Sequence, residues 1–165
     1  MEFKIRERTA FEVNLEKAEN KRKNTIKFIR NWIKADLLEN DEGKNLDLKQ
    51  YTPENMPIKQ HPIFSAGLKN GKVIGACISE FYENGLLRID KLVVGKEYGR
   101  QGIGLALMNS VIDYAKKNGI HNIQCVSLMS NKESKKFLRK AGFRKVGKLR
   151  RYLGKQDYYL WEYLP

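Results

Sequence analysis

The sequence predicts a mixed α/β or α+β domain built around one sheet. Apolar runs bounded by turn residues occur between residues 61 and 94 and again after residue 122, which is typical of strands. Between them, residues 103–115 carry apolar side chains at helical spacing. A length of 165 residues suits one hydrophobic core, so we expect a single domain over residues 1–165.

The first third of the chain is expected to contain a short strand followed by helix. Residues 2–6 alternate apolar and polar side chains, which predicts the strand. Residues 11–40 carry apolar residues at helical spacing, including Ile26 and Ile33, and predict a helix that is broken once. Residues 40–60 are polar and contain three Gly or Pro residues, so they read as a connection.

Three apolar runs, at residues 61–68, 73–82 and 86–94, predict an antiparallel three-stranded meander. Asn70-Gly71 lies in the first gap and Asn84-Gly85 lies in the second. An Asn-Gly pair between apolar runs favours a type I′ hairpin turn, because both residues tolerate a positive φ.

The second half of the chain alternates helices and strands. A helix is expected from Gly102 to Asn118, with cations in its last turn and Gly119 to close it. A second, short helix is expected after residue 129, where Ser130 and Glu133 have the spacing of a capping box. The remaining strands are expected at residues 123–128, 143–153 and 157–164.

The strong positive charge points to anionic ligands or partners. The chain has 32 Lys and Arg against 19 Asp and Glu, a formal net charge of +13. Basic residues are spread over nearly the whole sequence, so the pattern does not favour nucleic acid as the partner.

The two cysteines and the hydropathy pattern exclude several other classes. Cys77 and Cys125 lie far apart in apolar runs, so we expect buried free thiols and no metal site. The amino terminus has no apolar signal core and no window is apolar enough for a membrane span. We therefore expect a cytoplasmic protein that does not associate with membranes.

The segment LVVGKEYGRQGIGLALM predicts a phosphate-binding turn between a strand and a helix. Gly99, Gly102 and Gly104 leave room for a diphosphate to reach backbone N–H groups at the helix amino end, and Arg100 adds positive charge. The dinucleotide fingerprint fails because Leu107 stands at its third glycine, and the Walker loop fails because no GK[ST] follows. The alternative is that these glycines only permit a tight turn.

At this point the sequence resembles the GNAT superfamily of N-acetyltransferases. The run GRQGIG stands where that family has its pyrophosphate-binding signature, although Gly99 replaces the usual Gln or Arg. The run NKESKKFLRKAGF is similar to the later family motif that ends in Gly142-Phe143. The resemblance covers about residues 61–165, and residues 7–60 are expected to shape the acceptor side.

The resemblance implies a GNAT-like fold, with a mostly antiparallel sheet, splayed central strands and flanking helices. It also implies acetyl-CoA as cosubstrate, bound between the splayed strands, and no metal. The residues that it assigns to the cosubstrate are Leu92, Val93 and Val94 for the pantetheine arm and thioester, Gly99, Arg100, Gln101, Gly102, Ile103, Gly104 and Leu105 for the pyrophosphate, and Asn131, Ser134 and Phe137 from the later motif.

The usual catalytic acid of the family is absent, because Leu138 stands at the position of its tyrosine. Tyr152 is the first substitute, with Tyr158 and Tyr159 as alternatives, although aromatic residues in strands are commonly packing residues. Asp90 and Glu80 are the candidate bases, with solvent-facing or paired charges as the alternative interpretation.

The sequence therefore predicts transfer of an acetyl group from acetyl-CoA to a primary amine by direct attack in a ternary complex. The acceptor is expected to be a peptide N-terminus or a small amine, because an α-amine is easier to deprotonate than a lysine side chain. Two other functions stay open: a CoA-binding module without catalysis, and a basic nucleic-acid-binding protein. The protein is expected to be a monomer or a homodimer.

Overall fold

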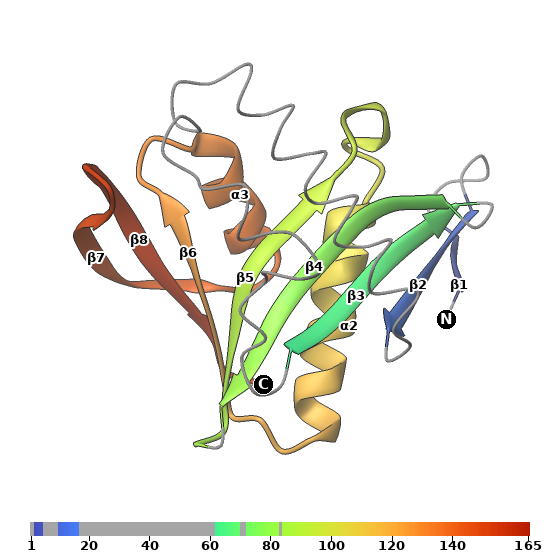
Figure 1. Ribbon diagram of the computed structural model, residues 1–165, viewed down its shortest axis with the longest axis horizontal. Helices are drawn as coiled ribbons and strands as arrows, with labels where there is room; N and C mark the ends of the chain where they lie inside the picture. Colours follow the sequence, from blue (N-terminus) through green and yellow to red (C-terminus); the bar gives the residue numbers. More distant parts are fainter. Residues whose placement is uncertain (1, 5–9, 17–61, 70–71, 83) are drawn as a thin grey trace, which may run out of the picture.

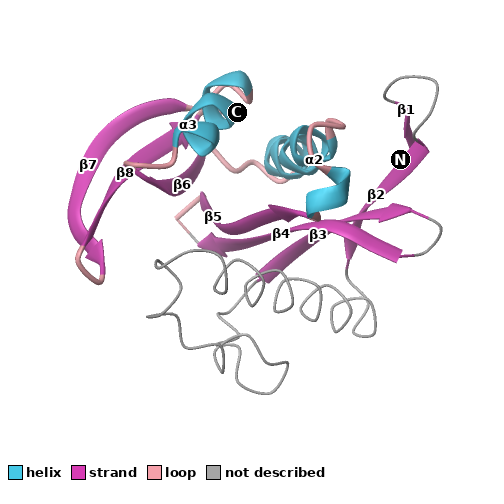
Figure 2. Ribbon diagram, turned by 90° about the horizontal axis from the view of Figure 1, so that it is seen from above, coloured by secondary structure: helices cyan, strands magenta, loops and turns pink. Residues whose placement is uncertain are grey.

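The computed structural model describes residues 2–4, 10–16, 62–69, 72–82 and 84–165. Within these residues, one sheet has the strand order β1-β2-β3-β4-β5-β6-β8-β7 (Figure 1). Helices α2 and α3 lie on the same side of this sheet (Figure 2). The strands are β1 (Glu2–Lys4), β2 (Ala10–Glu16), β3 (Pro62–Lys69), β4 (Lys72–Tyr82), β5 (Leu86–Val94), β6 (Asn122–Leu128), β7 (Arg144–Leu153) and β8 (Gln156–Tyr163), and the helices are η3 (Lys96–Tyr98), α2 (Ile103–Lys117) and α3 (Lys132–Lys140).

The sheet is antiparallel at every described pairing except that of β5 with β6. This parallel pairing is short, since it joins Leu86–Arg88 to Asn122–Gln124. The predicted mixed fold, with a mostly antiparallel sheet and splayed central strands, is confirmed.

The start of the chain differs from the sequence prediction. Residues 10–16 form strand β2, paired with β1 and β3, where the sequence analysis expected a helix from residue 11. The segment AFEVNLE alternates apolar and polar residues with period two, which suits a strand. The rest of the expected helix, the connection at 40–60 and the turn at Asn70-Gly71 lie outside the described residues.

The meander of β3, β4 and β5 is confirmed, but its second turn is not of the expected type. The Gly85 N–H donates to Tyr82 O at 3.0 Å, so Gly85 is the fourth residue of the turn and not a central one. Gly85 has φ +81° whereas Asn84 does not have a positive φ. This is a three-residue loop that ends in a left-handed glycine, and not a two-residue type I′ turn.

Helix α2 forms as predicted and packs against the sheet through an apolar face. Ile103, Leu107 and Val111 on this face are almost completely buried. Gly75 on β4 permits close approach, because a Cβ at this position would lie 3.0 Å from Ile103 Cγ2. Gly119 follows the helix with φ +66° and closes it as expected.

Helix α3 begins one residue later than the predicted capping box would require. The cap is Asn131, whose Oδ1 accepts a hydrogen bond from the Ser134 N–H at 2.9 Å. The expected box of Ser130 and Glu133 is therefore wrong. Asn is as good an N-cap as Ser, and here it satisfies a backbone donor of the first turn.

The terminal strands β7 and β8 form the predicted pair, and β8 also joins β6. Trp161 on β8 is completely buried, and its indole N–H donates to Ser127 Oγ on β6 at 2.9 Å. This bond satisfies the polar atom that burial of a tryptophan would otherwise leave without a partner.

Both cysteines are buried free thiols, as expected. Burial raises the pKa of Cys77 and of Cys125 from 9.0 to about 12, since the thiolate would lose its hydration. No cluster of potential metal ligands occurs in the described part of the chain. No helix among the same residues has the length and hydropathy to cross a membrane.

The raised thiol pKa values predict a loss of stability at alkaline pH. The folded protein keeps thiol protons that the unfolded chain releases, so this contribution is complete below pH 9.0 and is lost as the pH rises toward about 12. Each thiol lowers the free energy of unfolding by up to about 1.4 kcal/mol per pH unit in that window. Urea unfolding near pH 8, 9 and 10 should show a smaller alkaline loss for Cys77→Ala than for the wild type. Parallel losses in the two proteins would contradict the prediction.

Candidate active site

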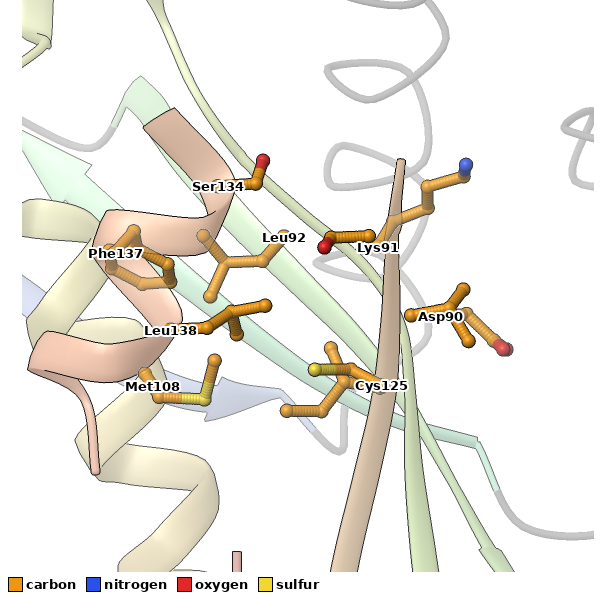
Figure 3. Close-up of a pocket in the computed structure, with 11 residues that line it drawn as sticks. Asp90, Lys91, Leu92, Met108, Cys125, Ser134, Phe137 and Leu138 are labelled. Atoms are coloured by element: carbon orange, nitrogen blue, oxygen red, sulfur yellow. The ribbon is translucent and has the colours of Figure 1, made fainter. Parts of the chain in front are cut away.

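A cleft opens where β5 and β6 separate beyond their short parallel pairing (Figure 3). The strands diverge from Ile89 and Cys125 onward, while β5 stays paired with β4 and β6 stays paired with β8. The edge of β5 that faces β6 has no described ladder partner there, so its peptide groups border the cleft. The cleft holds about 110 Å³ and is lined by Ile89, Asp90, Lys91, Leu92, Met108, Cys125, Val126, Ser127, Ser134, Phe137 and Leu138.

A β-bulge in β5 determines which side chains face this cleft. Ile89 pairs with Ser79 and Lys91 pairs with Ile78, so Asp90 is an extra residue without a partner in the register. The extra residue reverses the alternation of the strand. Ile89 before the bulge and Leu92 after it therefore both pack into the core on the side of the helices.

The glycine turn leads directly into the amino end of α2, beside the cleft. Gly102 has φ +84°, a left-handed conformation that other residues adopt at a cost. The first helical bond runs from Ala106 N–H to Gly102 O, and within the described residues no side chain caps the helix and no acidic residue lies in its first turn. The backbone N–H groups of this turn and the helix dipole are suited to an anion.

The other glycines of the turn have different roles. Gly99 has φ −60°, which any residue adopts. A Cβ on Gly104 would lie 3.4 to 3.6 Å from Phe137, Leu92 and Val94, so this glycine lets α2 lie close to β5 and α3. Gln101 Nε2 donates to Glu97 O at 3.3 Å within the turn.

Helix α3 contributes an apolar wall to the cleft. Ser134, Phe137 and Leu138 line it, and Leu138 is buried among core residues at 5% exposure (Figure 3). No titratable group therefore stands at the position of the family tyrosine. Asn131 lies at the start of this helix, where its Oδ1 caps the backbone, and its expected contact with the pantetheine stays a prediction.

On the face of the sheet that points away from the helices, a polar cluster lies beside the part of β5 that borders the cleft. Arg88 donates a hydrogen bond to the Tyr152 phenol oxygen and lies over the Tyr152 ring at 5.8 Å. Arg88 Nε also lies 3.9 Å from Asp90 Oδ1. Burial disfavours the charged guanidinium, but the hydrogen bond to Tyr152 and the nearby Asp90 outweigh it and raise the Arg88 pKa.

Glu80 joins this polar cluster from the neighbouring strand. It stands opposite Arg88 in the register of β4 and β5, so the two side chains share a face. Glu80 is 6% exposed and accepts a hydrogen bond from the Tyr82 hydroxyl at 2.7 Å. Sequence reasoning missed Tyr82, because a tyrosine at a strand end carries no signal of a buried carboxylate partner.

The tyrosine alternatives separate onto the two faces of the sheet. Tyr158 stacks edge-on against Tyr152, with ring centroids 5.8 Å apart. Tyr159 lies on the side of α3, where its ring contacts Trp161 and the Lys135 ammonium group. The structure thus brings Asp90, Glu80 and Tyr152 into one cluster around Arg88, and it leaves Tyr159 outside that cluster.

The fold and the cleft together define a class of protein. The resemblance implied acetyl-CoA between splayed strands with a pyrophosphate-binding turn beside them, and the structure has a sheet that opens between β5 and β6 with the uncapped amino end of α2 beside the opening. The acetyltransferase (GNAT) family model matches residues 26–143. The chain belongs to the GNAT family of acetyltransferases.

One relative by sequence and two solved structures agree with this assignment. An uncharacterised N-acetyltransferase of Methanocaldococcus jannaschii is 34% identical over 80 residues, which are 45% of this chain and 35% of that protein. The match thus spans about a third of the length of this curated relative. The ribosomal-protein-S18-alanine N-acetyltransferase of Escherichia coli superposes with a TM-score of 0.72 over 93% of both chains, at 15% identity. A Bacillus anthracis protein described as a putative streptothricin acetyltransferase, solved with acetyl coenzyme A, has a TM-score of 0.59 at 21% identity, over 66% of this chain and 65% of its own.

The contact between Arg88 and Tyr152 predicts an energetic coupling that a double-mutant cycle can measure. Tyr152→Phe removes the acceptor of a charged hydrogen bond and should cost about 1–2 kcal/mol in urea unfolding. The double variant Arg88→Gln/Tyr152→Phe should lose about 1 kcal/mol less free energy of unfolding than the sum of the two single variants. Tyr163→Phe is the matched control, because Tyr163 stacks on Phe143 away from Arg88 and should be additive with Arg88→Gln. Full additivity of the Tyr152 pair would contradict the contact.

Proposed function

We propose that the protein transfers the acetyl group of acetyl-CoA to a primary amine of low pKa, such as a peptide N-terminus. The observation that carries the proposal is the cleft between β5 and β6 with the uncapped amino end of α2 beside it. An elongated donor with an anionic end and an apolar arm matches both features.

The residues of the cleft are chemically suited to this donor. The backbone N–H groups from Gly102 to Leu105 would receive the pyrophosphate, with Arg100 as a nearby cation, because a helix amino end favours negative charge. The unpaired edge of β5 at Leu92–Val94 offers peptide groups to an amide-containing arm. Phe137 and Ser134 on α3 form the opposite wall.

The polar cluster is suited to the acceptor side of the reaction. The acetyl thioester supplies an activated carbonyl carbon, which the neutral amine nitrogen attacks as the C–N bond forms and the C–S bond breaks. The amine proton passes to a carboxylate, Asp90 or Glu80, directly or through water. Arg88 donates to the Tyr152 oxygen, which leaves the phenol hydrogen available for the departing thiolate.

Leu138 changes what the reaction requires of the other residues. A thiol with a pKa near ~8.5 leaves as a thiolate without obligatory protonation, so loss of the tyrosine acid does not prevent transfer. A lysine amine of pKa ~10.4 costs about 4–5 kcal/mol to deprotonate at pH 7, whereas an α-amine near ~8 costs about 1 kcal/mol. This difference favours α-amines, the acceptor type named for the Escherichia coli S18 enzyme.

A CoA-binding module without catalysis is the second candidate function. The buried Leu138 favours it, because the position of the family acid holds only an aliphatic side chain packed in the core. The two functions share the donor site and differ in turnover.

Acetyl-CoA should raise the melting temperature of the wild type, with a stabilisation of about 2.7 kcal/mol at 100 times the dissociation constant. Gly102→Val should abolish the shift, since a branched side chain in the turn blocks the backbone donors and strains a φ of +84°. Gly154→Val is the matched control: Gly154 also has a positive φ, +61°, and a Cβ there meets nothing within 4 Å. The control should keep its shift, and equal loss in both variants would contradict the assignment of the turn.

Release of free thiol from acetyl-CoA should be faster with peptides that present an α-amine than with N-terminally blocked peptides that present lysine. The reason is the cost of deprotonation, and the measurement is a thiol-reactive dye assay over a matched peptide panel. Turnover of lysine side chains alone would overturn the acceptor preference. Binding of acetyl-CoA without turnover of any amine would favour the binding module.

In the same assay, Asp90→Asn and Glu80→Gln distinguish the two candidate bases. Loss of a general base should lower kcat/KM by about 10²-fold or more, with a larger effect below pH 7 than above it. Equal, small effects of both variants would count against either carboxylate as the base.

A further inference from the structure

Although basic residues occur along nearly the whole chain, most of its net positive charge comes from one segment. Residues 131–157 contain eleven Lys and Arg, one third of the total of 32, and two acidic residues, Glu133 and Asp157. The net charge of these 27 residues is therefore +9, out of +13 for the whole chain. The segment runs from the N-cap of α3 through β7 and the loop after it to the second residue of β8.

The fold brings the cations of α3 and β7 together over the aromatic residues of β8. Lys135 on α3 and Lys145 on β7 both lie over the Tyr159 ring, at 5.8 and 4.6 Å from its centre. Arg139, one helical turn after Lys135, lies over Trp161 at 6.0 Å. Lys148 stands opposite Tyr159 in the register and so shares that face. We call Lys135, Arg139, Lys145 and Lys148, with Tyr159 and Trp161 beneath them, the basic surface.

In the part of the chain that the structure describes, few acidic side chains lie near enough to neutralise the cations of the basic surface. Arg139, Lys145 and Lys148 are exposed and Lys135 is partly buried. Within the described residues, the ion pair that involves cations of this segment is Lys136 with Glu133, at 3.5 Å. Gathering like charges on one face costs free energy unless a counter-charge is bound, so the arrangement is suited to an anionic partner.

Acetyl-CoA does not account for this surface. On α3, Ser134, Phe137 and Leu138 line the cleft, whereas Lys135 and Arg139 lie against the rings of β8. Figure 2 shows α3 between α2 on one side and the hairpin of β7 and β8 on the other. The basic surface and the cleft are therefore on different sides of the same helix.

The extent of the basic surface distinguishes between anionic partners. On β7, Lys145 and Lys148 lie about 10 Å apart at a rise of ~3.3 Å per residue, and Lys135 and Arg139 form a second row about 6 Å long on α3. Such rows suit a chain of phosphates better than a single phosphate group. A membrane would require a group of apolar residues to insert, and the large exposed apolar side chains among the described residues are Val146 and Leu153, seven positions apart on β7, and Leu164 after β8.

We propose that the basic surface binds the phosphate backbone of a single-stranded nucleic acid, with RNA as the probe in the test below. Proteins hold single strands without sequence preference by cations that follow the backbone together with rings on which bases stack, and Tyr159 is the partly exposed ring of this surface. Binding there would hold the enzyme on a nucleoprotein while the cleft stays accessible to an amine. The proposal does not depend on acetyl transfer.

The test measures fluorescence anisotropy of a labelled single-stranded RNA of about 20 nucleotides against full-length protein, between about 50 and 200 mM KCl. The wild type should bind, with a negative slope of log affinity against log salt. Lys145→Gln/Lys148→Gln should weaken binding about tenfold or more and make the slope shallower by about 1.4 units, since each phosphate contact on a single strand contributes ~0.7. Glutamine keeps much of the aliphatic stem over the aromatic rings.

The matched control is Lys116→Gln/Lys117→Gln, which removes the same charge from the exposed carboxyl end of α2. It should change the affinity by less than about twofold. Equal weakening in both variants would overturn the proposal, because only net charge would then matter. Absence of RNA binding at the lowest salt, displacement of RNA by saturating CoA, or binding to anionic phosphatidylserine vesicles but not to RNA would each overturn it. An unchanged melting shift with acetyl-CoA in the Lys145/Lys148 variant shows that the donor site is intact.

Discussion

The short parallel pairing of β5 with β6 is the constraint on which the rest of the site depends. Three residue pairs hold the strands together, and beyond them each strand stays bonded to its other neighbour. Peptide groups along the separating edges lose ladder partners, and unsatisfied polar groups in a partly enclosed cleft are costly. A ligand with its own amide groups would restore those hydrogen bonds, so the interruption of the sheet creates a candidate binding site.

The bulge at Asp90 makes the two sides of this opening chemically different. It lets Ile89 and Leu92 both face the helices, where they meet Leu138, while the extra residue, Asp90, approaches Arg88 on the other face. One face is thus apolar and closed by α3, and the other carries the polar cluster. With an aliphatic residue at position 138, the carboxylates and the phenol near the cleft come from the polar face.

The sequence predicted the elements correctly where the hydrophobic period of a segment and the turn residues at its ends agreed. The meander, α2 and the terminal hairpin followed from alternation, helical spacing and glycines. Strand β2 was predicted as helix because the alternating residues 10–16 lead directly into a longer segment with helical spacing. The bulge could not be predicted, since LLRIDKLVV reads as one uninterrupted run and the extra residue shows only in the register with β4. The meeting of Arg88 and Tyr152 depends on how β7 is placed in three dimensions, and no local pattern encodes it.

The contact of Arg88 with Tyr152 joins residues 64 positions apart and links β5 to β7, which lie on opposite sides of the opening. β5 and β6 separate beyond Arg88 and Gln124, and this side-chain contact joins the two parts of the sheet across the separation. The angle between β5 and β6 is therefore restrained by the Arg88–Tyr152 contact as well as by the backbone hydrogen bonds between the two strands. Under the proposed function, an acceptor that enters from this face would have to pass the Arg88–Tyr152 contact, so this contact would limit the size of the molecules that reach the cleft.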